Sequence, residues 1–324
     1  MFITVTLQSP ARADIRIGWQ TGVVNAILTY AFETGKFAQR GVKVELKPFP
    51  AGPAMLPALA AGEIDFGWMG EFPATTGFAN GLPIQIVLVQ SLLPTDVRLV
   101  ANPAAKIEKL ADLKGKKIGV TIGSTSHNFV LLALKAAGLS EQDVTLVNLA
   151  PAAMVPAYTA GQIDAAFTWE PGSGELEKQG GKVLATTQSL GSITGLFGVI
   201  NTDYLSKNQD EFQKFLQAWS DGLADYAKDP KAVLAYEAKR LNQTVEDLSA
   251  LIARQGAIFP PVEAQLSPNY LGSQDKPSDS AVLAQVGAIG QFLLDNKRID
   301  RLPASFGPLI NQAPVATFVR MKTR

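Results

Sequence analysis

Cysteine is absent from the 324 residues of this chain, and histidine occurs once, as His127. Without cysteine the chain has no disulfide framework, thiolate metal site or cysteine nucleophile, and no lipid is attached through an N-terminal cysteine. A single histidine excludes the HExxH zinc motif and multi-histidine clusters, which leaves carboxylates as the only plentiful metal ligands. We therefore expect no metal ion and no cofactor.

An excess of charge of either sign is also lacking. Lys and Arg together number 29, as do Asp and Glu, and the pI is near 6.6. No basic face is expected to neutralise phosphates, so nucleic acid is not an expected partner. Apolar residues make up 47% of the chain, which excludes a disordered protein, and the length suffices for two domains.

Long apolar runs are missing as well, so no window of about twenty residues resembles a membrane span. The triplet Ala11-Arg12-Ala13 fits a signal-peptidase site, although the preceding segment is short and lacks a basic leader. We interpret residues 1–13 as a signal-peptide remnant and Asp14 as the start of an exported protein. A cytosolic protein with a frayed end is the alternative.

The chain contains an internal repeat. Residues 54–65 (AMLPALAAGEID) return about a hundred positions later as residues 153–164 (AMVPAYTAGQID), and Gly18 is matched by Gly119 at a similar interval. An interval of this length is the size of a domain, so the repeat predicts two similar α/β lobes.

Both copies show strands alternating with helices. The expected strands are 15–19, 42–46, 64–68 and 84–89 in the first copy, and 117–122, 144–149, 163–168 and 183–186 in the second. Helical stretches between them close on Gly35 and Gly62. This order predicts parallel, doubly wound sheets, in which ligands bind outside the carboxyl ends of the strands.

Beyond Thr202 the sequence predicts helices that pack in the core. The signals are an aromatic stripe from Phe212 to Tyr226, a helix cap at Thr244 and the run 281–294.

Residues 123–128 (GSTSHN) follow a strand and precede a mostly apolar helix. Amides at a helix start and the helix dipole favour an oxyanion there, so Ser124, Thr125 and Ser126 are candidate ligand contacts. His127 could donate a further hydrogen bond, and a bound anion would favour its protonated form. Ordinary capping by the hydroxyls and a surface histidine are the alternatives.

Residues at other strand ends complete the candidate site, and Glu71 and Glu170 occupy matching places in the two copies. Glycine lets a ligand approach the backbone, aromatic faces cover its apolar part, and a carboxylate can hold a cationic group. Structural hydrogen bonds are the alternative for both carboxylates and for the glutamine. The candidates are Gln20, Gly70, Glu71, Phe72, Trp169 and Glu170.

Four motifs in this order carry a family resemblance: GEFP at 70–73, GKKIGV at 115–120, GSTSH at 123–127, and AGQID at 160–164 with WEP at 169–171. From residue 14 to about residue 303 the chain resembles solute-binding proteins of ABC importers, in the taurine and aliphatic-sulfonate branch. The resemblance implies a non-enzymatic periplasmic receptor with a two-lobed, type II-like periplasmic-binding-protein fold. Each lobe is then a doubly wound sheet with flanking helices.

The resemblance also implies how the receptor works. Two hinge segments, expected near 99–102 and 196–201, join lobe 1 (14–98 and 200–324) to lobe 2 (99–199). The lobes close on a small organosulfonate, and the receptor, expected to be a monomer, delivers it to an ABC permease complex in the inner membrane. Ser124, Thr125, Ser126 and His127 then meet the sulfonate, and Gln20, Glu71 and Trp169 line the remaining pocket.

One departure from the family concerns the ligand's amine. Taurine receptors of this type carry an acid near the segment 194–197, and TGLF in this chain has none. Either Glu71 replaces it or the ligand lacks an amine.

The alternative function is a receptor of the same fold for nitrate, another oxyanion or a thiamine or pyrimidine precursor. A similar pyrimidine-precursor synthase uses cysteine, which this chain lacks, and a signalling receptor would have the same cleft.

Overall fold

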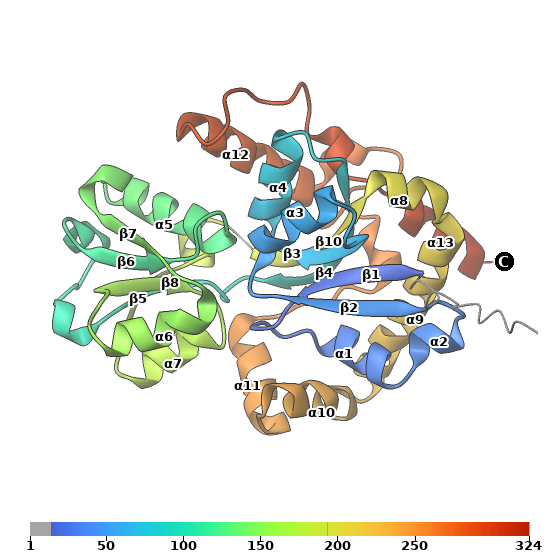
Figure 1. The fold of residues 1–324 in the computed structure, drawn as a ribbon, viewed down its shortest axis with the longest axis horizontal. Coiled ribbons are helices and arrows are strands. Elements are labelled where there is room, and N and C mark those ends of the chain that lie inside the picture. The colour runs from blue at the N-terminus through green and yellow to red at the C-terminus, as the bar shows by residue number, and fades with distance from the viewer. Residues whose placement is uncertain (1–13, 193, 324) are drawn as a thin grey trace, which may run out of the picture.

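The computed structural model describes residues 14–192 and 194–323, so the predicted signal-peptide remnant lies outside the described residues. Two five-stranded sheets lie side by side, each with helices on both faces, and form two lobes (Figure 1). The expected two-lobed α/β architecture is confirmed.

The first sheet has the strand order β2-β1-β3-β10-β4 and the second the order β7-β6-β8-β5-β9. The first contains β1 (Ile15–Gln20), β2 (Val44–Phe49), β3 (Phe66–Met69), β4 (Ile84–Leu93) and β10 (Thr194–Asn201). The second contains β5 (Arg98–Ala101), β6 (Lys117–Val120), β7 (Thr145–Asn148), β8 (Ala165–Thr168) and β9 (Lys182–Thr186).

The sheets are mixed, whereas the sequence predicted parallel ones. Strand β10 runs antiparallel to β3 and β4, and β5 runs antiparallel to β8 and β9. The chain leaves each sheet at the carboxyl end of a parallel strand. The first strand after each crossing, β5 or β10, therefore runs opposite to the parallel strands of the sheet that it joins. Residues 99–101 and 196–201, predicted as the crossings, therefore belong to strands, and 194–199 pairs in the first sheet rather than in lobe 2.

Helices cover both faces of each sheet (Figure 1). In the second lobe α5 (Thr125–Ala136) lies on one face, and α6 (Pro151–Thr159) and α7 (Gly172–Lys178) lie on the other. In the first lobe α3 (Met55–Ala60), α4 (Glu71–Ala79) and α12 (Ala281–Asp295) lie opposite α1 (Ala26–Glu33), α2 (Lys36–Gln39), α9 (Gln209–Lys228) and α10 (Pro230–Leu241). The remaining helices are α8 (Thr202–Lys207), α11 (Val245–Gln255) and α13 (Ala313–Lys322).

The repeated glycines have the same packing role in both lobes. A Cβ atom on Gly18 would lie 2.7 Å from Cδ1 of Ile64, and one on Gly119 would lie 2.5 Å from Cδ1 of Ile163. Each glycine lets the helix and turn before the third strand pack closely against the first strand. The repeat therefore encodes one strand–helix contact twice.

The helical C-terminal part completes the core of the first lobe, as predicted. The stripe on α9 is buried: the rings of Trp219 and Trp68 are 4.8 Å apart, and those of Phe215 and Phe37 are 5.4 Å apart. The side chain of Thr244 caps α11. These contacts fix the first sheet, and with it the strand ends that face the second lobe.

We expect Gly198→Ala in β10 to reduce the free energy of unfolding by about 1–3 kcal/mol, because the methyl group would overpack the core. Its Cβ would lie 2.6 Å from Cζ of the buried Phe66. Gly287→Ala in α12 is the control: its Cβ would meet nothing within 4 Å, so helix propensity should raise stability by about 0.5–1 kcal/mol. Urea denaturation measures both, and equal effects would contradict the packing of β10.

Candidate functional site

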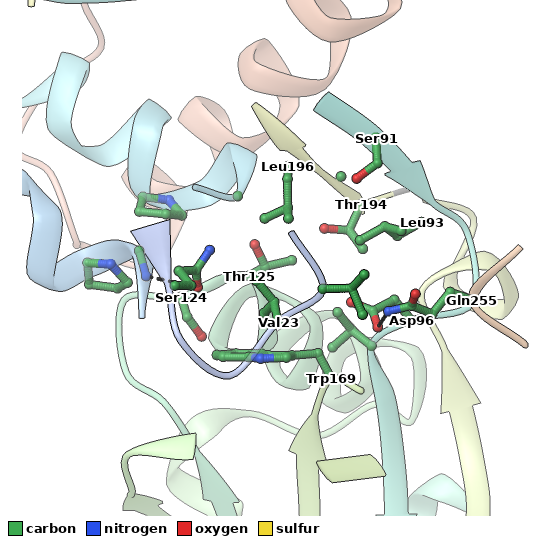
Figure 2. A pocket seen from close by; sticks show the side chains of 18 of the residues that line it. Val23, Ser91, Leu93, Asp96, Ser124, Thr125, Trp169, Thr194, Leu196 and Gln255 are labelled. Carbon is green, nitrogen blue, oxygen red and sulfur yellow. Dashed lines mark hydrogen bonds between the residues drawn. The ribbon is translucent and has the colours of Figure 1, made fainter. Parts of the chain in front are cut away.

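A small cavity lies between the lobes, at the carboxyl ends of the parallel strands (Figure 2). Its volume is about 40 Å³, and a water molecule needs roughly 10–15 Å³ by this measure, so the space suits a compact group. Of the predicted site residues, the wall contains Gln20, Gly70, Ser124, Thr125 and Trp169. Polar wall residues that were not predicted are Ser91, Asp96, Thr194 and Gln255.

The start of α5 forms one side of this cavity. The amides of His127 and Asn128 both donate to the carbonyl oxygen of Ser124, at 3.1 and 3.3 Å. The amides of Thr125 and Ser126 precede this first intrahelical bond and belong to the unpaired end of the helix. Together with the dipole of a helix of 12 residues they favour an anion. The helix start that the sequence predicts as an oxyanion site therefore borders the interlobe cavity.

The two serines of this loop bond mainly to the loop itself. The hydroxyl of Ser124 donates to the carbonyl oxygen of Thr121 at 2.7 Å, and the hydroxyl oxygen of Ser126 lies 2.8 Å from that of Ser124. Ser126 is buried and does not line the cavity. The serine hydroxyls therefore bond within the loop and do not cap the helix, since the side chain of Ser124 accepts from no helix amide. The backbone amides and Thr125 remain the donors for a ligand.

His127 and Phe72 lie behind the wall rather than on it. Nδ1 of His127 accepts from the amide of Gly123 at 3.2 Å, and burial lowers the pKa of His127 to about 4. Its ring packs edge-on against Phe72 at 6.2 Å, and Phe72 also packs against Phe292 of α12. Neither side chain lines the cavity, contrary to the prediction that both contact the ligand, because each is packed against an aromatic ring behind the wall.

Glu71 lies directly behind the wall. Its side chain is buried, and the hydroxyl of Thr194 donates to its two carboxylate oxygens at 3.2 and 3.0 Å. Thr125 is a second hydroxyl neighbour. Burial raises the pKa of Glu71 to about 7, since loss of hydration outweighs these hydrogen bonds. Glu71 therefore orients the wall hydroxyl of Thr194 instead of meeting a ligand itself.

Glu170 has a structural role, the alternative that the sequence left open. Its carboxylate is buried and pairs with Arg98 at 2.9 Å and with Arg254 of α11 at 2.8 Å. The adjoining Trp169 does line the cavity, and Figure 2 shows its ring along one side of the space. Of these two predicted ligand contacts, only Trp169 faces the cavity. The carboxylate of Glu170 instead ties the second lobe to α11.

Gln20 and Gly70 are held on the wall of the first lobe. Oε1 of Gln20 accepts from the amide of Gly52 at 3.1 Å, and its Nε2 donates to the carbonyl oxygen of Trp68 at 3.4 Å. A Cβ atom on Gly70 would lie 2.3 Å from Oγ1 of Thr125, so only glycine allows this approach of the two lobes. One N–H of the glutamine amide remains available to a ligand.

Helix α10 fixes the loop that follows β1. The buried carboxylate of Glu237 accepts from the amide of Asn25 at 2.5 Å, and it also pairs with Arg240. Arg240 donates to the carbonyl oxygen of Val23 at 2.8 Å and lies over the ring of Trp19 at 4.6 Å. The C-terminal part of the chain therefore positions this wall as well as covering the sheet.

Asp96 is the functional candidate that sequence reasoning missed. It lies in the crossing after β4, is 5% exposed, and lines the cavity. Its Oδ1 accepts from Nε2 of Gln255 at 2.7 Å and from the amide of Glu170 at 3.1 Å. Burial raises the pKa of Asp96 to about 6. The crossing lies outside the repeat, and a lone aspartate after a strand gave no signal.

Within residues 14–192 and 194–323, acidic and histidine side chains form no group that could hold a metal ion. No helix in the described part of the chain is both long and apolar enough to cross a bilayer.

Solved structures share this architecture. The periplasmic aliphatic sulphonate binding protein from Escherichia coli superimposes with a TM-score of 0.68 and 26% identity, over 89% of this chain and 94% of that chain. The alkanesulfonate-binding protein from Xanthomonas axonopodis pv. citri bound to MOPS gives 0.73 and 27%, over 95% and 99%. The fold is that of the two-lobed periplasmic binding proteins.

Sequence comparison assigns the chain to a narrower group of proteins than the fold does. The model of the family described as NMT1/THI5 like matches residues 24–233, so the chain belongs to that family. A taurine-binding periplasmic protein of Escherichia coli (strain K12) is 32% identical over 221 residues, which cover 67% of this chain and 68% of the relative. The resemblance to the taurine and aliphatic-sulfonate branch is confirmed.

We expect Glu71→Gln to flatten the pH dependence of stability. The unfolded carboxyl ionises near 4.5 but the folded one near 7, so wild-type stability falls as the pH rises through this window. The variant cannot ionise, so the wild type should lose stability relative to it between pH 4.5 and 7. Urea denaturation across that range measures the difference. Glu63→Gln controls for the loss of one exposed charge, and parallel profiles of wild type and Glu71→Gln would contradict the assignment.

Proposed function

We propose that this chain is the substrate-binding receptor of an ABC importer for small organosulfonates, taurine or alkanesulfonates, and that the sulfonate binds at the start of α5. The observation that carries the proposal is the junction of a helix start with a small interlobe cavity lined by Ser124 and Thr125. The names of the taurine-binding relative and of the two sulfonate-binding structures support the same ligand class.

The donors at this site suit a group with three acceptor oxygens. Gln20 of the first lobe and Thr125 of the second line the same cavity, and the free amides of Thr125 and Ser126 belong to the helix start beside it. Such charge-assisted hydrogen bonds are about twice as strong as neutral ones. Closing the lobes would complete the set, because Gln20 comes from the first lobe and the helix start from the second.

A receptor fits the site better than an enzyme does. The hydroxyl of Ser124 donates to a backbone carbonyl and His127 is not on the wall, so Ser124 has no base that would activate it as a nucleophile. A desulfurization enzyme superimposes with a TM-score of 0.67 at 15% identity, a likeness of fold alone. The proposal includes export to the periplasm, a monomeric state and delivery of the ligand to a membrane permease.

A thermal unfolding screen tests this function. Taurine or an alkanesulfonate at about a hundred times its dissociation constant should raise the free energy of unfolding by about 2.7 kcal/mol. Nitrate and pyrimidine precursors, the ligands of the alternative receptor, should have no such effect. Stabilisation by one of these and by no sulfonate would replace the proposal with the alternative.

Thr125→Ala should weaken sulfonate binding by about 1.5–3 kcal/mol, because it removes a hydrogen bond to a charged ligand. Thr76→Ala in α4 is the matched control, since the hydroxyl of Thr76 donates to the carbonyl oxygen of Phe72 in its own helix. Isothermal titration measures both affinities. Equal affinity of the Thr125 variant and wild type would remove this hydroxyl from the site.

A further inference from the structure

The cavity wall carries one charged side chain, and that side chain is acidic. Among the residues that line the cavity in the described part of the chain, none is a lysine or arginine, and Asp96 is the only carboxylate. A ligand that is simply an anion would therefore share a small space among buried side chains with a second negative charge. Like charges held close together in such a medium repel strongly.

We propose that Asp96 is the cation subsite of this cavity, and that the receptor prefers a zwitterionic aminosulfonate whose ammonium group pairs with Asp96 while its sulfonate binds at the start of α5. The inference rests on the proposed function and adds a specificity-determining residue to it.

The arginines beside Asp96 are already paired with other carboxylates. Arg98 contacts Glu170 at 2.9 Å and Glu177 at 2.6 Å, and Arg254 contacts Glu170 at 2.8 Å. In residues 14–192 and 194–323 we find no ion pair to Asp96. The cluster thus holds three carboxylates and two guanidinium groups, which leaves one negative charge at the cavity for a ligand to compensate.

Asp96 also has hydrogen-bonding capacity left. Both of its contacts, from Gln255 and from the amide of Glu170, go to Oδ1. Among the described residues no donor contacts Oδ2, although each carboxylate oxygen has two acceptor sites. Burial raises the pKa of Asp96 to about 6, so the group is ionised at pH 8 and its charge costs free energy until a cation arrives.

The cavity places the two polar ends apart. Figure 2 shows Ser124 and Asp96 on opposite sides of the space, with the ring of Trp169 along it and Leu196 across from that ring. Apolar side chains between an anion site and a cation site suit a short methylene spacer. Glu71, which sequence analysis considered for the amine, lies behind the wall and bonds to Thr194 instead.

Calorimetric titration with taurine (2-aminoethanesulfonate) and 1-propanesulfonate at pH 8 tests the assignment, because these probes are similar in length and differ in the amine. The wild type should bind taurine at least about tenfold more tightly, as expected for a hydrogen bond between charged groups. Asp96→Asn should abolish that preference by weakening taurine about tenfold or more, with propanesulfonate unchanged or tighter. Asparagine can still accept from Gln255. Asp221→Asn, which removes an exposed carboxylate that pairs with Arg40 outside this cluster, is the control and should keep the preference.

The outcomes separate the two proposals. If neither sulfonate binds the wild type, the proposed function fails and this inference fails with it. If propanesulfonate binds the wild type as tightly as taurine, the proposed function stands and the cation subsite is overturned. Equal weakening of both ligands by Asp96→Asn would show a purely structural role and would likewise overturn it.

A measurement on the wild type covers the case in which Asp96→Asn does not fold. The groups that face Asp96 are Gln255, Arg98, and both the amide and the carboxylate of Glu170. Protonation of Asp96 removes the partner of the ammonium group, so the taurine-to-propanesulfonate affinity ratio should fall as the pH drops from 8 to 5. A ratio that stays constant over this range would contradict the proposal.

Discussion

The interlobe cavity has to stabilise an anion although none of the described residues on its wall has a cationic side chain. Backbone amides at the start of α5 and the dipole of that helix supply the positive potential, and their directions are set by the fold before any ligand arrives. Most of the polar contacts around the cavity serve to hold these donors in place. The hydroxyls of Ser124 and Ser126 stabilise the loop, and Glu71 holds the hydroxyl of Thr194 from behind the wall.

The crossing between the lobes is tied to the C-terminal part of the chain. Arg254 and Gln255 at the end of α11 contact Glu170 and Asp96, and the hydroxyl of Thr95 donates to the carbonyl oxygen of Arg254 at 2.5 Å. Helix α10 fixes the loop after β1 in a similar way. Residues that sequence analysis regarded as core therefore determine where both walls of the cavity lie.

The fold was predictable where the sequence repeats a contact. Gly18 and Gly119 meet equivalent isoleucines, so the similarity of the two lobes is visible in the chain itself. The antiparallel strands β5 and β10 were not predictable in this way. Strand β10 is buried on both faces and contains Gly195 and Gly198, so neither alternation nor β propensity indicates it, and its direction depends on the crossing between lobes.

The site was predictable in part. The motif around Ser124 placed the helix start correctly, because a polar loop between a strand and an apolar helix has one possible location in such a sheet. Residue type did not tell which way His127, Phe72 and Glu170 point, since that depends on packing partners far along the chain. Glu71 and Glu170 occupy equivalent places in the repeat and yet bond to a threonine and to two arginines.

A crystal structure of the protein grown with taurine tests the central claim most directly. The account predicts sulfonate oxygens within hydrogen-bond distance of the amides of Thr125 and Ser126, in a cavity closed by both lobes, with the amine at Oδ2 of Asp96. A sulfonate bound away from the start of α5, or a cleft that stays empty while taurine binds elsewhere, would contradict it.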